Sequence, residues 1–321
     1  MLDTAPLGSS GLRISRVGIG TAPLGSTPDW SIYWGPQDER AAVRGVQAAL
    51  DGGVTWIDTA PYYGWGRAEE LVGRAIRGRG PDALVFTKCG TLRGGEGGEH
   101  VDLTPAAIRR DLEASLRRLG RDHVDMLQLH DPDPNVSIEE SWTEVQRLIA
   151  AGSVRYGGLS NHPLALVERA TTIAPVAAVQ YRYNLLSRDI ERDALPYGRA
   201  NGVGGLSWGS LAEGLLSDSF TVEELDAHDF RRARPNFREP RYSRIQRFVA
   251  ELAGIAAAAG STTAGVAIAW LLARPGLTGA IVGVRSESEG RALADAGQLR
   301  LPSAVFEQVD EALQRYERGE R

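Results

Sequence analysis

Short, continuously apolar runs alternate with longer stretches of helical spacing along most of the chain. The apolar runs occupy residues 14–22, 54–60, 83–90, 124–130, 154–161, 177–184, 203–210 and 278–286. Continuous rather than alternating apolar character is typical of parallel strands that are buried on both faces. Between the runs, apolar residues recur at helical spacing, as in 39–53, 68–80, 106–120, 138–152 and 243–260. The pattern therefore predicts eight strand–helix units.

Eight such units in a chain of 321 residues fit a single (β/α)8 TIM barrel of the α/β class. We expect one domain that covers residues 1–321. A doubly wound sheet is the rival fold, but no G-x-G-x-x-G follows any of the runs, so the usual dinucleotide fingerprint is missing. The barrel is the favoured architecture.

Turn and cap residues add detail to this expectation. The segment LGSSGLR (7–13) predicts a turn between two short strands that plug one end of the barrel. Thr104 and Ser137 are predicted helix N-caps. Residues 212–242 form a long loop after the seventh strand, and GGEGG (94–98) predicts a flexible loop after the third.

Composition excludes several classes of function. A net charge of −5 and a pI of about 5.7 argue against nucleic acid as a partner. The N-terminus lacks the layout of a signal peptide, and no apolar stretch reaches the roughly 18–20 residues of a membrane span. The single cysteine, Cys89, excludes an internal disulfide and a multi-cysteine zinc site. We therefore expect a cytoplasmic protein with no membrane partner and no metal, and the oligomeric state stays open.

The basic residues are 35 arginines and one lysine, Lys88. Arginine evidently serves wherever this chain wants a generic surface cation. The one lysine lies inside an apolar run, LVFTKCG. An ammonium is compact and its pKa shifts readily on burial, unlike that of a guanidinium. Chance retention is the plain alternative, but we interpret Lys88 as a chemical requirement.

Polar residues end several of the predicted strands. In a (β/α)8 barrel, the carboxyl ends of the strands carry the active site. The residues collected there are Asp58 with Tyr62 and Tyr63 shortly after it, Lys88, His130, Ser160 with Asn161, Gln180 and Trp208.

An acid, a lysine and a tyrosine at one mouth suggest a proton-transfer mechanism. A tyrosine pKa lies near 10, and a nearby ammonium lowers it. Asp58 would hold Lys88 charged, and His130 could hydrogen-bond the same substrate oxygen. The set suits a general acid that protonates a carbonyl oxygen as hydride reaches the carbon. From the spacing alone, Tyr62 and Tyr63 are both candidates.

Each of these residues also has a purely structural interpretation. Asp58 could cap a helix, the tyrosines could be packing, and His130 alone would more often be a satisfied core histidine. The prolines of HDPDP favour a stiff loop over a metal cluster. The constellation carries the hypothesis, and the single members do not.

The motifs DTAPYYG, TKCG and LQLH resemble those of the aldo-keto reductase family, in particular its bacterial members. The resemblance covers nearly the whole chain, from GIGTAPLG to GVRS. It implies a catalytic tetrad of Asp58, Tyr63, Lys88 and His130, and so selects Tyr63 over Tyr62.

The resemblance also implies that a nicotinamide dinucleotide is bound in extended form without a Rossmann motif. Ser160, Asn161 and Gln180 should hydrogen-bond the nicotinamide amide, and Trp208 should stack on its ring. The segment GSLAEGLL is similar to the family's pyrophosphate loop. The full set of expected cofactor contacts is Gly20, Thr21, Asp58, Ser160, Asn161, Gln180, Trp208, Gly209, Ser210, Leu211, Gly214, Gly283, Arg285, Ser286 and Glu289.

The choice of dinucleotide depends on the last of these residues. Arg285 and Ser286, before a predicted helix start, are placed to meet a 2′-phosphate and favour NADP(H). Glu289 stands where the family commonly has glutamine or arginine, and an acidic group beside a phosphate is unfavourable. NAD(H) therefore stays open as the alternative.

The resemblance implies an NADP(H)-dependent oxidoreductase that reduces aldehydes or ketones, or oxidises the corresponding alcohol or sugar. A pocket wall of Trp30, Tyr33, Trp34, Trp65 and Trp208, with His130, suits substrates with apolar faces, among them aldehydes, quinones and sugars. The alternative is an NADP(H)-binding regulatory subunit with little turnover, because the family also includes potassium-channel auxiliary subunits and lens structural proteins.

The argument from the solitary lysine makes a direct prediction. We expect Lys88→Arg to lose most of the carbonyl reductase activity although the positive charge is kept, because the planar guanidinium cannot take the position of the ammonium. Steady-state rates with a carbonyl substrate measure the effect. A wild-type rate in this variant would contradict the argument.

Overall fold

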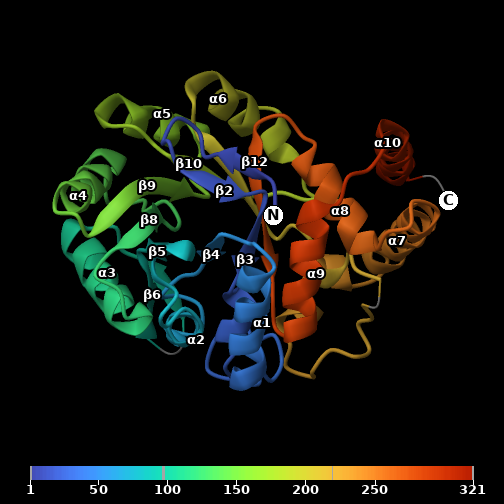
Figure 1. The fold of residues 1–321 in the computed structure, drawn as a ribbon, viewed down its shortest axis with the longest axis horizontal. Helices are drawn as coiled ribbons and strands as arrows, with labels where there is room; N and C mark the ends of the chain where they lie inside the picture. The colour runs from blue at the N-terminus through green and yellow to red at the C-terminus, as the bar shows by residue number, and fades with distance from the viewer. Residues whose placement is uncertain (1, 96–97, 219, 320–321) are drawn as a thin grey trace.

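The computed structural model describes residues 2–95, 98–218 and 220–319, and its centre is a closed barrel of parallel strands (Figure 1). The strands follow one another around the barrel in chain order. They are β3 (Val17–Gly20), β4 (Trp56–Asp58), β5 (Leu84–Cys89), β8 (Val124–Leu129), β9 (Val154–Ser160), β10 (Ala178–Arg182), β11 (Gly204–Trp208) and β12 (Leu277–Gly283). The predicted TIM barrel is therefore confirmed, one strand for each apolar run.

Helices surround the barrel on the outside (Figure 1). They are α1 (Glu39–Asp51), α2 (Arg67–Ala75), α3 (Pro105–Leu119), α4 (Ile138–Ala150), α5 (Leu164–Ile173), α6 (Ala194–Asn201), α7 (Arg241–Ala258), α8 (Thr263–Leu272), α9 (Glu287–Gln298) and α10 (Ser303–Arg318). Both predicted N-caps are confirmed: the hydroxyl of Thr104 accepts a hydrogen bond from the backbone of Ala107, and that of Ser137 from the backbone of Glu140.

An antiparallel hairpin precedes the barrel, as predicted from LGSSGLR. It consists of β1 (Thr4–Pro6) and β2 (Arg13–Ser15). Its buried side chains Leu7, Leu12 and Ile14 join one apolar cluster with residues inside the barrel, including Trp56 and Phe86. The hairpin therefore closes the end of the barrel opposite the polar strand ends.

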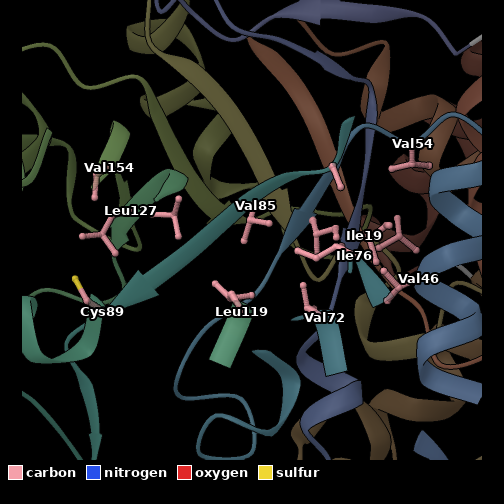
Figure 2. Packing of buried hydrophobic residues seen from close by; sticks show 14 of the residues in the cluster. Ile19, Val46, Val54, Val72, Ile76, Val85, Cys89, Leu119, Leu127 and Val154 are labelled. Carbon is pink, nitrogen blue, oxygen red and sulfur yellow. The ribbon is translucent and has the colours of Figure 1, made fainter. Parts of the chain in front are cut away.

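A second apolar layer lies between the strands and the outer helices. Figure 2 shows part of it, where Ile19 of β3 lies near Val46 of α1 and Val72 of α2, and Leu127 of β8 lies near Val154 of β9. Because every strand buries side chains on both faces, the continuous apolar runs of the sequence are explained.

The first and last strand–helix units are joined directly. Strand β12 pairs with β3, which closes the barrel. Outside it, α1 packs against α9 at Gly45 and Gly290, and a Cβ added to Gly290 would lie only 2.2 Å from the carbonyl oxygen of Gly45. Glycine is required here because the two helix backbones approach too closely for any side chain.

Two loops at the carboxyl end of the barrel contain local structure. After β5, the strands β6 (Thr91–Arg93) and β7 (Glu99–Val101) form an antiparallel hairpin where the sequence predicted only a flexible glycine loop, and residues 96–97 of that loop lie outside the described residues. The predicted long loop after β11 is confirmed, and it contains the short 3₁₀ helices η5 (Ala212–Gly214), η6 (Phe230–Ala233) and η7 (Pro235–Phe237).

Of the helices in the described part of the chain, none alone has both the length and the apolar character to cross a membrane; α7 and α8, which are bent by 88° at their junction, satisfy that test only as a pair.

The interior packing predicts opposite effects for two glycine substitutions. A Cβ at Gly18 would lie 2.2 Å from Cε2 of Trp56, whose indole is held by a hydrogen bond to the carbonyl oxygen of Ser15. We expect Gly18→Ala to lower the free energy of unfolding by about 1–3 kcal/mol. Gly254 of α7 is exposed, and a Cβ there would meet nothing within 4 Å. Gly254→Ala should therefore raise stability by about 0.5–1 kcal/mol. Urea unfolding of both variants checks the pair, and equal stabilities would contradict the packing described.

Candidate active site

Three of the four predicted catalytic side chains are hydrogen-bonded to one another at the carboxyl end of the barrel. The ammonium of Lys88, on β5, donates to Oδ1 of Asp58 at 2.5 Å and to the hydroxyl oxygen of Tyr63 at 3.0 Å. Its third hydrogen bond goes to the carbonyl oxygen of Thr59 at 3.1 Å. Asp58 ends β4, and Tyr63 lies in the turn before α2. All three donor hydrogens of the only lysine are thus used within this site.

Lys88 is completely buried, and its charge depends on its partners. Burial acts to lower the pKa of the Lys88 ammonium, but the carboxylate of Asp58 and the neighbouring Tyr63 raise that pKa above its ordinary value. Lys88 is therefore positively charged at neutral pH, as the sequence led us to expect.

The pKa of Tyr63 corrects one sequence expectation. Burial raises the pKa of the Tyr63 hydroxyl, the ammonium of Lys88 opposes this, and Asp58 adds to it, so the net shift is upward. The sequence argument considered only the ammonium and predicted a lowered value. Removal of the phenol from water is the larger effect because a phenolate loses more solvation than a phenol.

His130 follows directly on β8 and completes the predicted tetrad in space. Its ring lies edge-on to Tyr63, with 5.8 Å between the ring centres, and edge-on to Tyr62 at 5.7 Å. Burial, the positive charge of Lys88 and a smaller electrostatic contribution from His162 hold the pKa of His130 well below its usual range. Its Nδ1 is buried, and no residue in the described part of the chain forms a hydrogen bond with it. The site therefore presents a neutral imidazole beside the Tyr63 hydroxyl.

Of the two candidate tyrosines, only Tyr63 contacts the ammonium. Tyr62 turns toward Trp30 and Trp65, with ring centres 5.3 and 5.5 Å away. Burial raises the pKa of Tyr62 strongly. These three rings and His130 form one aromatic cluster, which we call the aromatic wall.

Not all the predicted wall residues belong to this cluster. The ring of Trp34 lies against Phe230 instead, 4.7 Å between centres, and under the guanidinium of Arg231. The carbonyl oxygen of Tyr33 accepts a hydrogen bond from the backbone of Phe230. Trp34 and Tyr33 thus join the loop after β3 to the long loop after β11.

The second carboxylate oxygen of Asp58 is held by two amides. Gln180 of β10 donates to Oδ2 of Asp58 at 2.8 Å, and Gln128 of β8 donates to the same atom at 3.2 Å. Gln180 also donates to the amide oxygen of Gln128 at 3.1 Å. Gln180 was expected among the cofactor contacts, whereas Gln128 was missed. A polar residue two positions before His130, and hence on the same strand face, was the available signal.

The predicted amide-binding residues lie beside this group. The hydroxyl of Ser160, at the end of β9, is buried without a partner. Asn161 adopts a positive φ of 58° and donates to the carboxylate of Asp131 at 2.9 Å. Its amide oxygen accepts a hydrogen bond from the indole of Trp208 at 2.9 Å. Asn161 therefore connects the end of β8 to the aromatic side chain that ends β11.

The segment after β11 lies at the same end of the barrel and has an irregular backbone. Gly209 and Gly214 have positive φ angles of 64° and 101°. Ser210 is buried, and its hydroxyl donates to the carbonyl oxygen of Ile281 at 2.8 Å. Leu211 is partly buried in the apolar layers. On the far side of β12, Thr21 follows Gly20 of β3 and donates its hydroxyl hydrogen to the carbonyl oxygen of Asp58.

The start of α9, after Gly283, contains the last three predicted contacts. Ser286 caps this helix by accepting a hydrogen bond from the backbone of Glu289. The carboxylate of Glu289 accepts one from the backbone of Arg285 at 2.6 Å. The guanidinium of Arg285 donates to the carbonyl oxygens of Trp34 and Pro36 and to the side chain of Gln37. Arg285 thus holds the loop after β3 against the start of α9.

Other ionisable groups fit the site less well. Cys89 points away from the barrel interior into the outer apolar layer (Figure 2), and burial raises the pKa of its thiol well above the usual value. In the part of the chain that the structure describes, no group of three or more His, Cys, Asp or Glu side chains is arranged to hold a metal ion. The site therefore combines the Tyr63 hydroxyl and the His130 imidazole with one buried cation, Lys88.

Comparisons with known proteins agree with this geometry. A model of the Aldo/keto reductase family matches residues 16–314. Aldo-keto reductase YhdN of Bacillus subtilis is 34% identical over 299 residues, which are 92% of this chain and 88% of YhdN. The solved glycerol dehydrogenase AKR11B4 of Gluconobacter oxydans is 32% identical, with a TM-score of 0.86 over 98% of this chain and 95% of that one. An aldo/keto reductase of Klebsiella pneumoniae, solved in complex with NADP and acetate, is 26% identical, with a TM-score of 0.75 over 97% of this chain and 95% of that one.

Proposed function

Because the chain belongs to the aldo/keto reductase family, and is thus an oxidoreductase of CH–OH and carbonyl groups, we propose that Tyr63 is its general acid. In this proposal the protein reduces aldehydes or ketones with NADP(H) and oxidises the corresponding alcohol or sugar in reverse, in the cytoplasm. One observation carries the proposal: the Tyr63 hydroxyl accepts a hydrogen bond from a fully buried ammonium that Asp58 keeps charged.

The proton transfer follows from the charges at the site. The reduced nicotinamide, when bound, supplies the hydride that reaches the carbonyl carbon. Tyr63 gives its hydroxyl proton to the carbonyl oxygen, and the phenolate left behind is stabilised by Lys88 at 3.0 Å. His130, neutral because its pKa is lowered, donates a hydrogen bond to the same oxygen. Solvent then returns a proton to Tyr63.

The residues around the tetrad fit a dinucleotide. The buried hydroxyl of Ser160 has no hydrogen-bond partner among the described residues, and a bound nicotinamide amide would satisfy it. Asn161, Gln180 and Trp208 lie at the same mouth. The N-terminus of α9, with Ser286 as its cap, suits the phosphate end.

NADP(H) is the favoured cofactor, in line with the NADP complex of the Klebsiella relative. The carboxylate of Glu289 is already bonded at the start of α9, and Arg285 is bonded to backbone carbonyls, so the preference over NAD(H) depends on how these two side chains respond to a 2′-phosphate.

The aromatic wall indicates the substrate. Tyr62 lies beside His130, and Trp30 and Trp65 pack against Tyr62, so the cluster suits the apolar part of a carbonyl compound or the face of a sugar. The Gluconobacter relative is named a glycerol dehydrogenase, which adds small polyols to this class. Indole rings stack on both kinds of molecule, so both belong in the first substrate panel.

The first experiment compares initial rates of NADPH and NADH oxidation with an activated aromatic aldehyde and with glyceraldehyde, beside a cofactor titration by tryptophan fluorescence. Faster turnover with NADPH supports the proposal and the contact of Arg285 with the 2′-phosphate. Faster turnover with NADH would make Glu289 the deciding residue. Tight binding without turnover on any carbonyl would favour a regulatory subunit and reject the enzyme.

The role of Tyr63 can be separated from cofactor binding. We expect Tyr63→Phe to abolish turnover, because no other proton donor contacts Lys88, while the fluorescence titration gives an almost unchanged NADPH affinity. A comparable loss of cofactor affinity would show that the role of the tyrosine had been misread.

The raised pKa of Tyr63 predicts different pH profiles for the two directions. Reduction needs the protonated phenol, so its rate should be level through neutral pH and fall only as pH rises through the raised pKa. Oxidation of an alcohol needs the phenolate, so its rate should increase as pH rises through the same pKa. Profiles of kcat/KM in both directions from about pH 7 to about pH 11.5, a range that extends above the ordinary tyrosine pKa, test this. Parallel profiles would exclude Tyr63 as the titrating group.

A further inference from the structure

We propose that Gln128 is a positioning residue of the reaction, which holds the carboxylate of Asp58 and fixes the orientation of the Gln180 amide. The inference rests on the proposed function, since it assigns a role within the same site. Gln128 belongs neither to the tetrad nor to the expected cofactor contacts.

The placement of Gln128 is set by the barrel. It lies on β8 directly opposite Lys88 of β5 in the strand register, and its side chain is completely buried. On its other side, β9 presents Gly158, where an added Cβ would lie 3.0 Å from Cγ of Gln128 and 3.1 Å from Sδ of Met126. The missing side chain of Gly158 thus leaves space in the barrel interior for the long side chain of Gln128, and any larger residue at position 158 would clash with it.

Hydrogen-bond direction gives Gln128 its specific effect. A carboxylate only accepts hydrogen bonds, so each glutamine must turn its NH2 group, not its oxygen, toward Oδ2 of Asp58. The second amide hydrogen of Gln180 is taken by the oxygen of Gln128 at 3.1 Å. Both amide hydrogens of Gln180 are therefore used, so the oxygen is the part of this amide that would meet a ligand. Gln128 thus acts together with Asp58 to exclude the flipped amide of Gln180, whose oxygen would face two acceptors.

The same contacts hold Asp58 in place. Its Oδ1 accepts a hydrogen bond from the ammonium of Lys88, and its Oδ2 accepts hydrogen bonds from two amides. Both oxygens of the carboxylate are therefore fixed by hydrogen bonds. The amide donors also draw negative charge away from the ion pair. Since the charge of Asp58 acts to raise the pKa of Tyr63, Gln128 acts, through Asp58, to keep that pKa from rising further.

The charged and titratable groups around this position are few. Asp58 faces it from β4 and Lys88 from β5, and His130 follows on β8 itself. The neighbouring strands β9 and β10 contribute Gly158 and Gln180, which do not titrate. Tyr63, the group whose titration reports the effect, faces Lys88, Asp58, Asp131 and the ring of His130.

Two substitutions separate the hydrogen bonds from the packing. Gln128→Leu keeps an apolar side chain in the space but removes both bonds. Gln128→Glu is isosteric, and in its protonated form it restores a donor to Asp58 and an acceptor for Gln180. The matched control is Met126→Leu, a volume-conserving change one step down the same face of β8.

We expect Gln128→Leu to lower kcat by about 10- to 100-fold with little change in KM for the carbonyl substrate. The alkaline fall of the reduction rate should also move to higher pH. The pH profile of kcat for Gln128→Glu should contain a transition that the wild type lacks. Its kcat should be near normal at acidic pH, where the new carboxyl is protonated, and should fall as pH rises and that carboxyl ionises. Met126→Leu should match the wild type, and thermal unfolding of all variants checks that the fold is kept.

The outcomes distinguish this inference from the proposed function. Absence of turnover in the wild type rejects the proposed function. With turnover present and lost in Tyr63→Phe, a wild-type kcat and pH profile in Gln128→Leu overturns the role of Gln128, as does a Gln128→Glu variant without the acid-side recovery. NADPH affinity, measured by fluorescence without turnover, is a separate readout. It should weaken in Gln128→Leu but not in Met126→Leu, and equal affinities overturn the orientation of Gln180 by Gln128.

Discussion

The buried positive charge of Lys88 determines which polar side chains are needed at the carboxyl end of this barrel. The ammonium of Lys88 is wholly buried, and such a group is stable in its charged form only when paired and fully hydrogen-bonded. Asp58 provides the opposite charge, Thr59 a carbonyl and Tyr63 a hydroxyl. The buried carboxylate in turn needs donors of its own, which the two glutamines supply. One buried cation thus accounts for a polar layer across β4, β5, β8 and β10.

The electrostatic result is a site that favours protonated tyrosine and neutral histidine. Burial raises the pKa of Tyr63 more than Lys88 lowers it, and it lowers the pKa of His130 together with that same ammonium. Both shifts favour the uncharged forms, so the site holds two neutral hydrogen-bond donors near one cation. Negative charge that develops on a substrate oxygen would be met by these groups without any prior rearrangement of solvent.

The sequence predicted the barrel because each strand is a continuous apolar run, and it predicted the tetrad positions because each polar residue stands at the end of a run or shortly after it. It missed the β6–β7 hairpin, because these three-residue strands are mostly polar and too short to show an alternation of apolar and polar residues. It missed Gln128 because the partners of this residue come from two other strands. For Arg285 it identified the residue, but the contact with Trp34 spans most of the chain and has no local signal.

The pairing of β12 with β3 has a consequence for the order in which the protein is made. The tetrad residues have all been synthesised once residue 130 is reached, but the barrel closes only when Leu277–Gly283 meets Val17–Gly20. The glycine contact between α1 and α9 is completed later still. A nascent chain on the ribosome therefore carries all four tetrad residues for nearly half of its synthesis without a closed barrel around them. The polar layer around Lys88 is enclosed only when the strand of residues 277–283 has been made, late in translation.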